Sequence, residues 1–191
     1  KPSWLLESAR IGLSPAEVVQ ILDTQSYFDL LKLPYPETRE AVLERLERER
    51  LLVKNHQGLG ITNLGAVLIA KRLDEFEGVA RKAPRVIVYD GKGKLRTKRE
   101  QISNKGYAVA FDSLVQFIES QTPANEVIEQ ALRREARMYP TIAIRELVAN
   151  ALIHQEFTES GVSVMIEIYS DRIEVSNPGQ PSVQPERFID E

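Results

Sequence analysis

The segment "AIRELVANALIHQEF", from Ala143 to Phe157, constrains the fold of this chain more than any other stretch. Its apolar residues would fall on almost every side of a helix, which predicts a helix packed on several faces. Glu146, Asn150 and His154 nevertheless recur at every fourth position, so they lie one above another on a single stripe. Each would cost several kcal/mol if it were buried without a hydrogen-bond partner. The stripe must therefore face a partner, a cavity or water.

Length and composition limit the classes of protein to which the chain can belong. Its 191 residues are enough for one sizeable domain or two small ones. The absence of cysteine excludes disulfides and thiolate metal sites and favours a cytoplasmic location. The two histidines, His56 and His154, are too few for a multi-histidine metal site. No apolar run approaches the ~20 residues of a membrane span, so we expect no membrane partner.

The N-terminus, "KPSWLLESARIG", has neither an initiator Met nor the apolar core of a secretory signal. These features predict an excised fragment. We therefore expect its function to be shared with parts of a longer protein.

The order of predicted elements in residues 1–80 is that of a winged-helix unit. Ser14, Pro15 and Glu17 form a good capping-box start for one helical stretch that ends at the breaker 34–36. A second helix follows over 38–50, and then come two short strands around a turn and a third helix. The second helix carries five Glu against four Arg from position 37 onward, which argues against direct DNA reading by it. A packing or dimerising module is the alternative.

The centre of the chain is basic. Residues 81–106 contain nine Lys and Arg against two acids, whereas 156–191 contain eight acids against two Arg. "RVIVYD" and "KLRTKREQI" are predicted to be paired strands around a glycine turn. Phosphate contact is one interpretation of this zone, and a solvated surface hairpin is the other. The candidate nucleic-acid contacts are Lys92, Lys94, Arg96 and Lys98.

A further helix is predicted over 110–121, and the polar stripe is followed by a predicted hairpin. In this hairpin Val162, Val164, Ile166 and Ile168 alternate with polar or larger residues, which predicts a strand with one buried face. A partner strand begins near Ile173 and ends at the turn 177–179. The stripe would form one wall of a pocket, and the turn would form its edge.

These residues resemble a known family. "RELVANALIH" resembles the N box of the GHKL ATPases, whose Bergerat fold is shared by gyrase B, histidine kinases and MutL, and "IEVSNPG" stands in place of their Gly box. More closely, "YPTIAIRELVANALIHQEF" with "IEIYSDRIEVSNPG" and "PERFID" resembles the C-terminal part of the RecG-related, AlbA/Schlafen-domain-containing transcriptional regulators. "YFDLLKLP", "ITNLGAVLIAK" and "NKGYAV" are similar to the linking region of that family, in which a DNA-binding AlbA-like domain lies upstream.

The resemblance implies roles for five residues. Asn150 would coordinate an Mg²⁺ that bridges the ATP phosphates, because an amide oxygen and waters suit a small hard cation. Glu146 would act as the catalytic residue and orient or deprotonate the attacking water, if hydrolysis occurs. Gly179 would allow the backbone to approach adenine, and Asn177 would accept its amino group. His154 would reach the phosphate side or cap the end of the stripe.

The sequence also departs from the GHKL pattern. Asn177 stands where the family has an Asp, so its hydrogen bond to adenine would carry no charge. Pro181 replaces the second glycine of the box, and the sequence stops twelve residues after Gly179, before a lid or second Gly box. Lys92 and Lys94 do not lie in a Walker A pattern, so the resemblance does not imply helicase chemistry.

Together these observations predict a mixed α/β (α+β) fold. A helical, winged-helix-like part over 1–80 should precede an α/β region over 81–191, with a truncated GHKL-like ATPase segment at about 136–191 that forms a partial Bergerat-type α/β sandwich. The expected function is that of a fragment of an ATP-binding, DNA-linked transcription regulator. ATP and Mg²⁺ are expected to bind the full-length protein and need not bind this fragment, and a homo-oligomer is a further partner. A non-enzymatic regulatory or dimerisation module and a nucleic-acid-binding domain that uses 81–105 are the alternatives. Whether the chain is an enzyme stays open.

Overall fold

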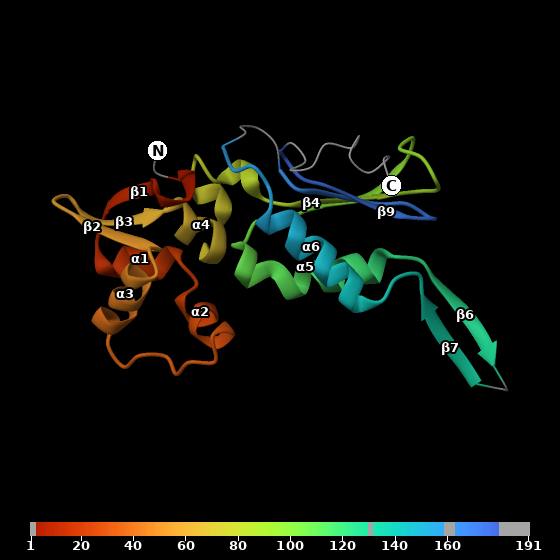
Figure 1. Ribbon diagram of the computed structural model, residues 1–191, viewed down its shortest axis with the longest axis horizontal. Coiled ribbons are helices and arrows are strands. Elements are labelled where there is room, and N and C mark those ends of the chain that lie inside the picture. Colours follow the sequence, from red (N-terminus) through yellow and green to blue (C-terminus); the bar gives the residue numbers. More distant parts are fainter. Residues whose placement is uncertain (1–2, 130–131, 159–162, 180–191) are drawn as a thin grey trace, which may run out of the picture.

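The structure, a computed structural model, describes residues 3–129, 132–158 and 163–179. Two α/β parts lie along the long axis of the molecule, and a two-stranded hairpin projects from one end (Figure 1). The predicted mixed α/β class is confirmed. Pro181, Val162 and the segment "PERFID" lie outside the described residues.

The N-terminal part consists of a small antiparallel sheet and the helices packed on it. The sheet has the order β1-β3-β2, with β1 (Ser8–Leu13), β2 (Leu52–Asn55) and β3 (Gly58–Thr62). Between β1 and β2 come the helices α1 (Pro15–Ile21), α2 (Thr24–Leu30) and α3 (Arg39–Arg48). The short helix η1 (Trp4–Leu6) precedes the sheet, and α4 (Asn63–Ile69), η2 (Leu73–Glu75) and η3 (Ala80–Lys82) follow it.

The start of α1 confirms the predicted capping box, but the first helical stretch is not continuous. Ser14 Oγ accepts a hydrogen bond from the Glu17 N–H at 3.2 Å, and Glu17 Oε2 accepts one from the Ser14 N–H at 2.7 Å. The prediction of one helix up to the breaker 34–36 is wrong because Asp23 caps a new helix, α2, by accepting from the Ser26 N–H at 3.0 Å. Leu22 leaves the helix and forms a β-bridge with Ala70.

The C-terminal part is a four-stranded sheet in the order β5-β4-β8-β9. Its strands are β4 (Arg85–Tyr89), β5 (Thr97–Ile102), β8 (Met165–Ile168) and β9 (Ile173–Ser176), and only the β4–β8 pair is parallel. The helices α5 (Tyr107–Gln121) and α6 (Thr141–Ile153) lie side by side along one face of the sheet (Figure 1). The projecting hairpin, β6 (Ala124–Glu129) with β7 (Leu132–Arg137), was not predicted.

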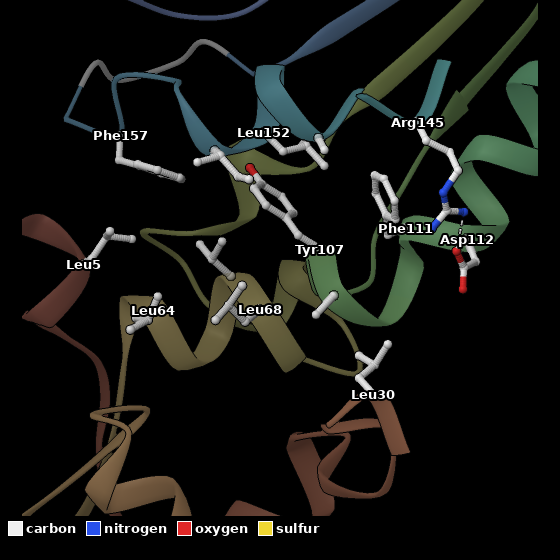
Figure 2. A pocket seen from close by; sticks show the side chains of 14 residues that line it. Leu5, Leu30, Leu64, Leu68, Tyr107, Phe111, Asp112, Arg145, Leu152 and Phe157 are labelled. Atoms are coloured by element: carbon white, nitrogen blue, oxygen red, sulfur yellow. Dashed lines mark hydrogen bonds and ion pairs between the residues drawn. The ribbon is translucent and has the colours of Figure 1, made fainter. Parts of the chain in front are cut away.

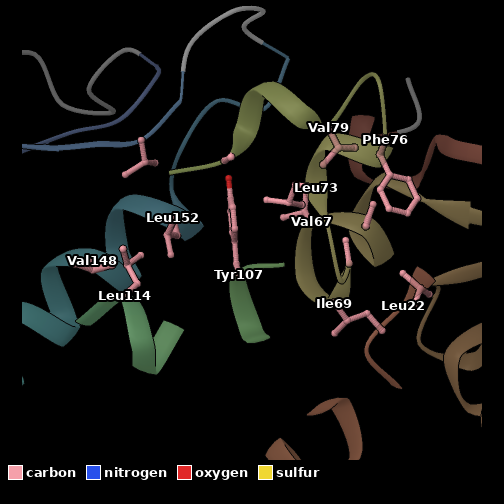
Figure 3. Close-up of a cluster of buried hydrophobic side chains, with 14 of the residues drawn as sticks. Leu22, Val67, Ile69, Leu73, Phe76, Val79, Tyr107, Leu114, Val148 and Leu152 are labelled. Atoms are coloured by element: carbon pink, nitrogen blue, oxygen red, sulfur yellow. The ribbon is translucent and has the colours of Figure 1, made fainter. Parts of the chain in front are cut away.

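One apolar core joins the two parts. Leu22 and Ile69 of the N-terminal part belong to the same buried cluster as Leu114 and Val148 of the C-terminal part (Figure 3). Gly106 makes the junction possible, because a Cβ at this position would collide with the backbone of α4. The helix α5 therefore begins directly against α4, and the two parts share a continuous interior.

The strand β8 is buried on both faces, so the prediction of a single buried face is wrong. Ile166 and Ile168 face the helices, but Glu167 and Tyr169 on the other face are buried as well. The reason is the interior position of β8 between β4 and β9, where Tyr89 packs over the second face and its ring stacks on that of Tyr169 at 4.9 Å.

Candidate functional site

The helix α6 buries one face only. Pro140 is the N-cap residue, one position before the first helical residue, Thr141. The residues buried against α5 and the sheet are Ile144, Val148, Ala151 and Leu152. Ile142 is 74% exposed and Ile153 is 67% exposed, so the prediction of a helix packed on several faces is wrong. Among the described residues, the elements that pack against this helix lie on one side of it.

The polar stripe lies on the open side of α6. Successive helical residues turn by about 100°, which places Glu146 and Asn150 opposite the buried face and His154, the C-cap residue, at its flank. All three residues are exposed. Among the described residues their side chains form neither a hydrogen bond nor an ion pair, although the His154 N–H donates to the Asn150 carbonyl at 3.0 Å as the last helical bond. The stripe therefore presents a carboxylate, an amide and an imidazole to whatever approaches this side.

The strand β9 runs beside α6 next to the stripe. A cavity of about 70 Å³ separates Ile173 of β9 from Ala143 and Leu147, which adjoin the stripe on α6. At the other end of β9 the Pro178 carbonyl accepts a hydrogen bond of 2.7 Å from the Glu156 N–H, two residues after His154. Strand and helix thus run in the same direction, with a small apolar cavity near their start and a bonded turn at their end.

The turn after β9 brings a glycine against the end of α6. Gly179 has a φ of +126°, which favours glycine, and a Cβ there would lie 3.2 Å from Glu156 Cβ. Asn177 and Gly179 are both exposed. The structure therefore brings the turn 177–179 to the His154 end of the stripe, although about 25 residues separate them in the sequence.

The polar side chains of this region suit a cation that is held partly by a ligand's phosphates better than a metal ion held by protein groups alone. Within the described ranges no group of three or more His, Cys, Asp or Glu could hold a metal ion. Mg²⁺ commonly takes one or two protein ligands and completes its shell with phosphate oxygens and waters. The exposed Asn150 amide and Glu146 carboxylate fit that pattern, one helical turn apart.

Of the four predicted nucleic-acid contacts, Lys94 has a structural partner. Its Nζ lies 2.9 Å from Glu167 Oε2 in an ion pair, and Tyr89 Oη donates to the same oxygen at 2.9 Å. Glu167 is 8% exposed at the side chain, so its carboxylate requires these donors. Burial by itself would raise the pKa of Glu167, but the hydrogen bonds from Lys94 and Tyr89 outweigh burial and lower it.

The other three basic residues are exposed and have no ion pair within the described part of the chain: Lys92, Arg96 and Lys98. The loop that carries the first two is held in place by its backbone. Arg172 Nη1 donates to the Lys92 carbonyl at 3.1 Å, and the Ser170 N–H donates to the Gly91 carbonyl at 3.0 Å. Three cations therefore remain available on an anchored loop and strand.

No pattern in the sequence predicted the apolar cavity between the two parts of the chain. It has a volume of about 460 Å³ and lies between α4, α5 and α6, with Leu30 of α2 and Leu5 of η1 at its border (Figure 2). Arg145 and Asp112 form an ion pair of 2.7 Å at one end. A pattern within one helix could not have predicted it, because its lining comes from both parts of the chain.

Comparisons with known proteins show a shared fold. No family model matches the sequence, and no curated protein matches it either. The structure is similar to the crystal structure of the DIP2311 protein from Corynebacterium diphtheriae, with a TM-score of 0.63 and 18% sequence identity. The likeness covers 95% of this chain and 35% of that protein, so the chain spans about a third of its length. Separately, no helix among the described residues is long and apolar enough to cross a membrane.

Proposed function

We propose that the chain is part of an ATP-binding, DNA-linked transcription regulator of the RecG-related type, with a divergent GHKL-type nucleotide site. The observation that carries the proposal is the meeting of two separate segments. The polar stripe of α6 is exposed, and the turn at Gly179 is hydrogen-bonded to the residues that directly follow it. These are the two segments on which the family resemblance rests.

The architecture supports the same proposal. Three helices between the first and second strands of a β1-β3-β2 sheet follow the order of a winged-helix unit, which we propose for residues 1–80. A sheet covered on one face by α5 and α6 suits part of a Bergerat-type sandwich, which we propose for the C-terminal part. A regulator of this kind would join a DNA-linked module to a nucleotide-responsive one.

Each residue of the proposed site has a role that follows from its chemistry. The Asn150 amide would hold Mg²⁺, which neutralises charge on the ATP phosphates when it is bound. Glu146, one helical turn away, would position a water molecule beside those phosphates. His154 lies at the end of α6 nearest the turn, where its imidazole would donate to a phosphate oxygen.

The adenine end would lie at the turn after β9. Gly179 is exposed at this turn, and the exposed Asn177 amide beside it would accept a hydrogen bond from the adenine amino group.

The basic segment offers a DNA contact. We propose that Lys92, Arg96 and Lys98 bind phosphate and that Lys94 serves mainly to neutralise Glu167.

A second function is favoured by a different observation. Ile142, Ile153 and Met138 are large apolar residues that are exposed on or beside α6, where a partner protein would remove them from water. A regulatory or dimerisation module without nucleotide chemistry would use this surface.

Thermal unfolding with and without Mg-ATP separates the two functions. Nucleotide binding stabilises the folded state by mass action, about 2.7 kcal/mol at a hundred times the Kd. We expect Mg-ATP to raise the Tm of the protein and Asn150→Ala to abolish that rise. Thr141→Ala, an exposed change at the start of the same helix, is the matched control and should keep it. An equal rise in both variants would contradict the proposed site.

A further inference from the structure

We propose that the cavity between α4, α5 and α6 binds a small organic cation with an apolar body and an amine at one end. This inference is independent of the nucleotide site. The cavity volume of about 460 Å³ lies within the range of small-molecule sites, and such sites commonly occur between domains. Three features of the cavity indicate the chemistry of the ligand: its lining, the polar atoms at its ends and its position between the two parts of the chain.

The middle of the cavity is apolar. Leu64 and Leu68 come from α4, Phe111 comes from α5 and Leu152 comes from α6, and their side chains point into the same space (Figure 2). Each square ångström of apolar ligand surface removed from water here would contribute roughly 25 cal/mol. A ligand must therefore carry a hydrocarbon or aromatic body.

The one polar side chain in the middle is already satisfied. Tyr107 Oη donates to the Lys82 carbonyl at 2.6 Å and accepts from Gln155 Nε2 at 2.9 Å. Its hydroxyl proton is thus engaged within the protein. A ligand needs no polar group at this point, and its polar group must lie at an end of the cavity.

One end of the cavity is acidic. Asp112 lines the main cavity and also an adjoining cavity of about 250 Å³, where Asp29 accompanies it. Arg145 pairs with Asp112 at 2.7 Å while its guanidinium lies 5.0 Å from the centre of the Phe111 ring. Asp112 and, in the adjoining cavity, Asp29 thus give this end two carboxylates against the single guanidinium of Arg145, and the excess negative charge favours a cationic group.

The opposite end also offers acceptors. Leu5 and Phe157 are shared with a second cavity of about 410 Å³, which Glu7 and Glu156 line. Gln155 lines it too, and its Oε1 is buried without a hydrogen-bond partner among the described residues. A buried acceptor without a partner is costly, so a hydrogen-bond donor is favoured at this end as well. Both ends of the cavity therefore offer acceptors to a hydrogen-bond donor on the ligand.

The position of the cavity gives such a ligand a regulatory effect. Leu30 and Leu64 belong to the N-terminal part, whereas Phe111 and Arg145 belong to the C-terminal part. A molecule that contacts both would stabilise their present arrangement by its differential affinity for it. The inferred site would thus let a small cation act on both modules at once.

Three probes of matched shape test the ligand class: 4-phenylbutylamine, 4-phenylbutanol and 4-phenylbutyrate, titrated calorimetrically at pH 7. We expect saturable binding of the amine at least tenfold tighter than that of the carboxylate, with the alcohol between them. Asp112→Asn should reduce the preference for the amine at least fivefold, because it leaves Asp29 as the one carboxylate at this end against the charge of Arg145. Equal affinities, a preference for the carboxylate in the unaltered protein, or no saturable binding would overturn the inference.

Two variants test the location. Ala149→Trp places a large side chain in the cavity and should abolish binding of the amine, whereas Ile142→Trp lies on the same helix outside the lining and should preserve it. Circular dichroism would show whether both variants fold. If Ala149→Trp does not fold, Ala108→Leu fills the same cavity from α5 and should weaken binding at least fivefold. Undiminished binding in a folded cavity-filling variant would overturn the location.

Discussion

The backbone N–H of Glu156 donates a hydrogen bond of 2.7 Å to the carbonyl of Pro178. This bond joins the end of α6 to the turn after β9 and so connects the two segments of the proposed nucleotide site. The next residue, Gly179, lies against Glu156 with a φ of +126°. The geometry of the site therefore depends on a glycine that packs against the residues following a helix.

Replacing that glycine should strain the turn. Gly179→Ala places a Cβ at 3.2 Å from Glu156 Cβ in a backbone conformation that L residues rarely adopt. We expect the free energy of unfolding to fall by roughly 1–3 kcal/mol, as measured by urea denaturation. Gly78→Ala is the control, since a Cβ there meets nothing within 4 Å, and should change stability by about 0.5 kcal/mol or less. Equal stabilities of the two variants would show that the turn is not strained.

The buried carboxylate of Glu167 should make stability depend on acid pH. Its pKa is below the ordinary value of 4.5, so its contribution is present above 4.5 and is lost as the pH falls through the lower folded pKa. Glu167→Gln should lower the free energy of unfolding at pH 7 by roughly 1–3 kcal/mol, and the difference should shrink toward pH 3. Denaturation at several pH values measures this. A difference independent of pH would assign the loss to packing alone.

Tyr107 should produce a loss of stability at alkaline pH. Burial raises the pKa of its hydroxyl to about 12, from an ordinary value of 10.0. The unfolded chain therefore releases this proton first, and stability falls by up to about 1.4 kcal/mol per pH unit between these values. Tyr107→Phe should remove this part of the slope in urea denaturation between pH 9 and 11.5. An unchanged slope would contradict the burial of the hydroxyl.

The basic residues should differ in their effect on DNA binding. Each phosphate contact adds about one unit to the slope of log affinity against log salt. The triple variant Lys92→Ala, Arg96→Ala, Lys98→Ala should reduce that slope by about three units, as measured by fluorescence anisotropy with duplex DNA. Lys94→Ala should change the slope little, because its charge is paired with Glu167. A similar change in slope for Lys94→Ala would contradict its assignment as a structural residue.

Local patterns in the sequence predicted most elements of the structure. The capping box at Ser14 and the β-branched run from Arg85 are confirmed because each depends on residues within a few positions. The short strand β1 and the break at Asp23 were missed. The strand β1 forms because it pairs with β3, about 50 residues later in the sequence. The helix breaks at Asp23 because the side chain of this residue caps a new helix.

The surroundings of the predicted site residues were harder to predict than the residues themselves. The spacing of Glu146 and Asn150 placed them on one stripe, but whether that side of the helix is covered depends on which layers pack against it. The pairing of Lys94 with Glu167 joins positions 73 apart and follows from the parallel contact of β4 with β8. No local charge count could have distinguished Lys94 from its neighbours.

Calorimetric titration of ATP, with and without Mg²⁺, into the protein and its Asn150→Ala variant tests the central claim most directly. Asn150 is exposed, so its replacement should leave stability within about 0.5 kcal/mol and any loss of binding would report on the ligand. We predict saturable binding that requires Mg²⁺ and is lost in Asn150→Ala. Absence of binding by the unaltered protein, or equal binding by the variant, would contradict the proposed nucleotide site.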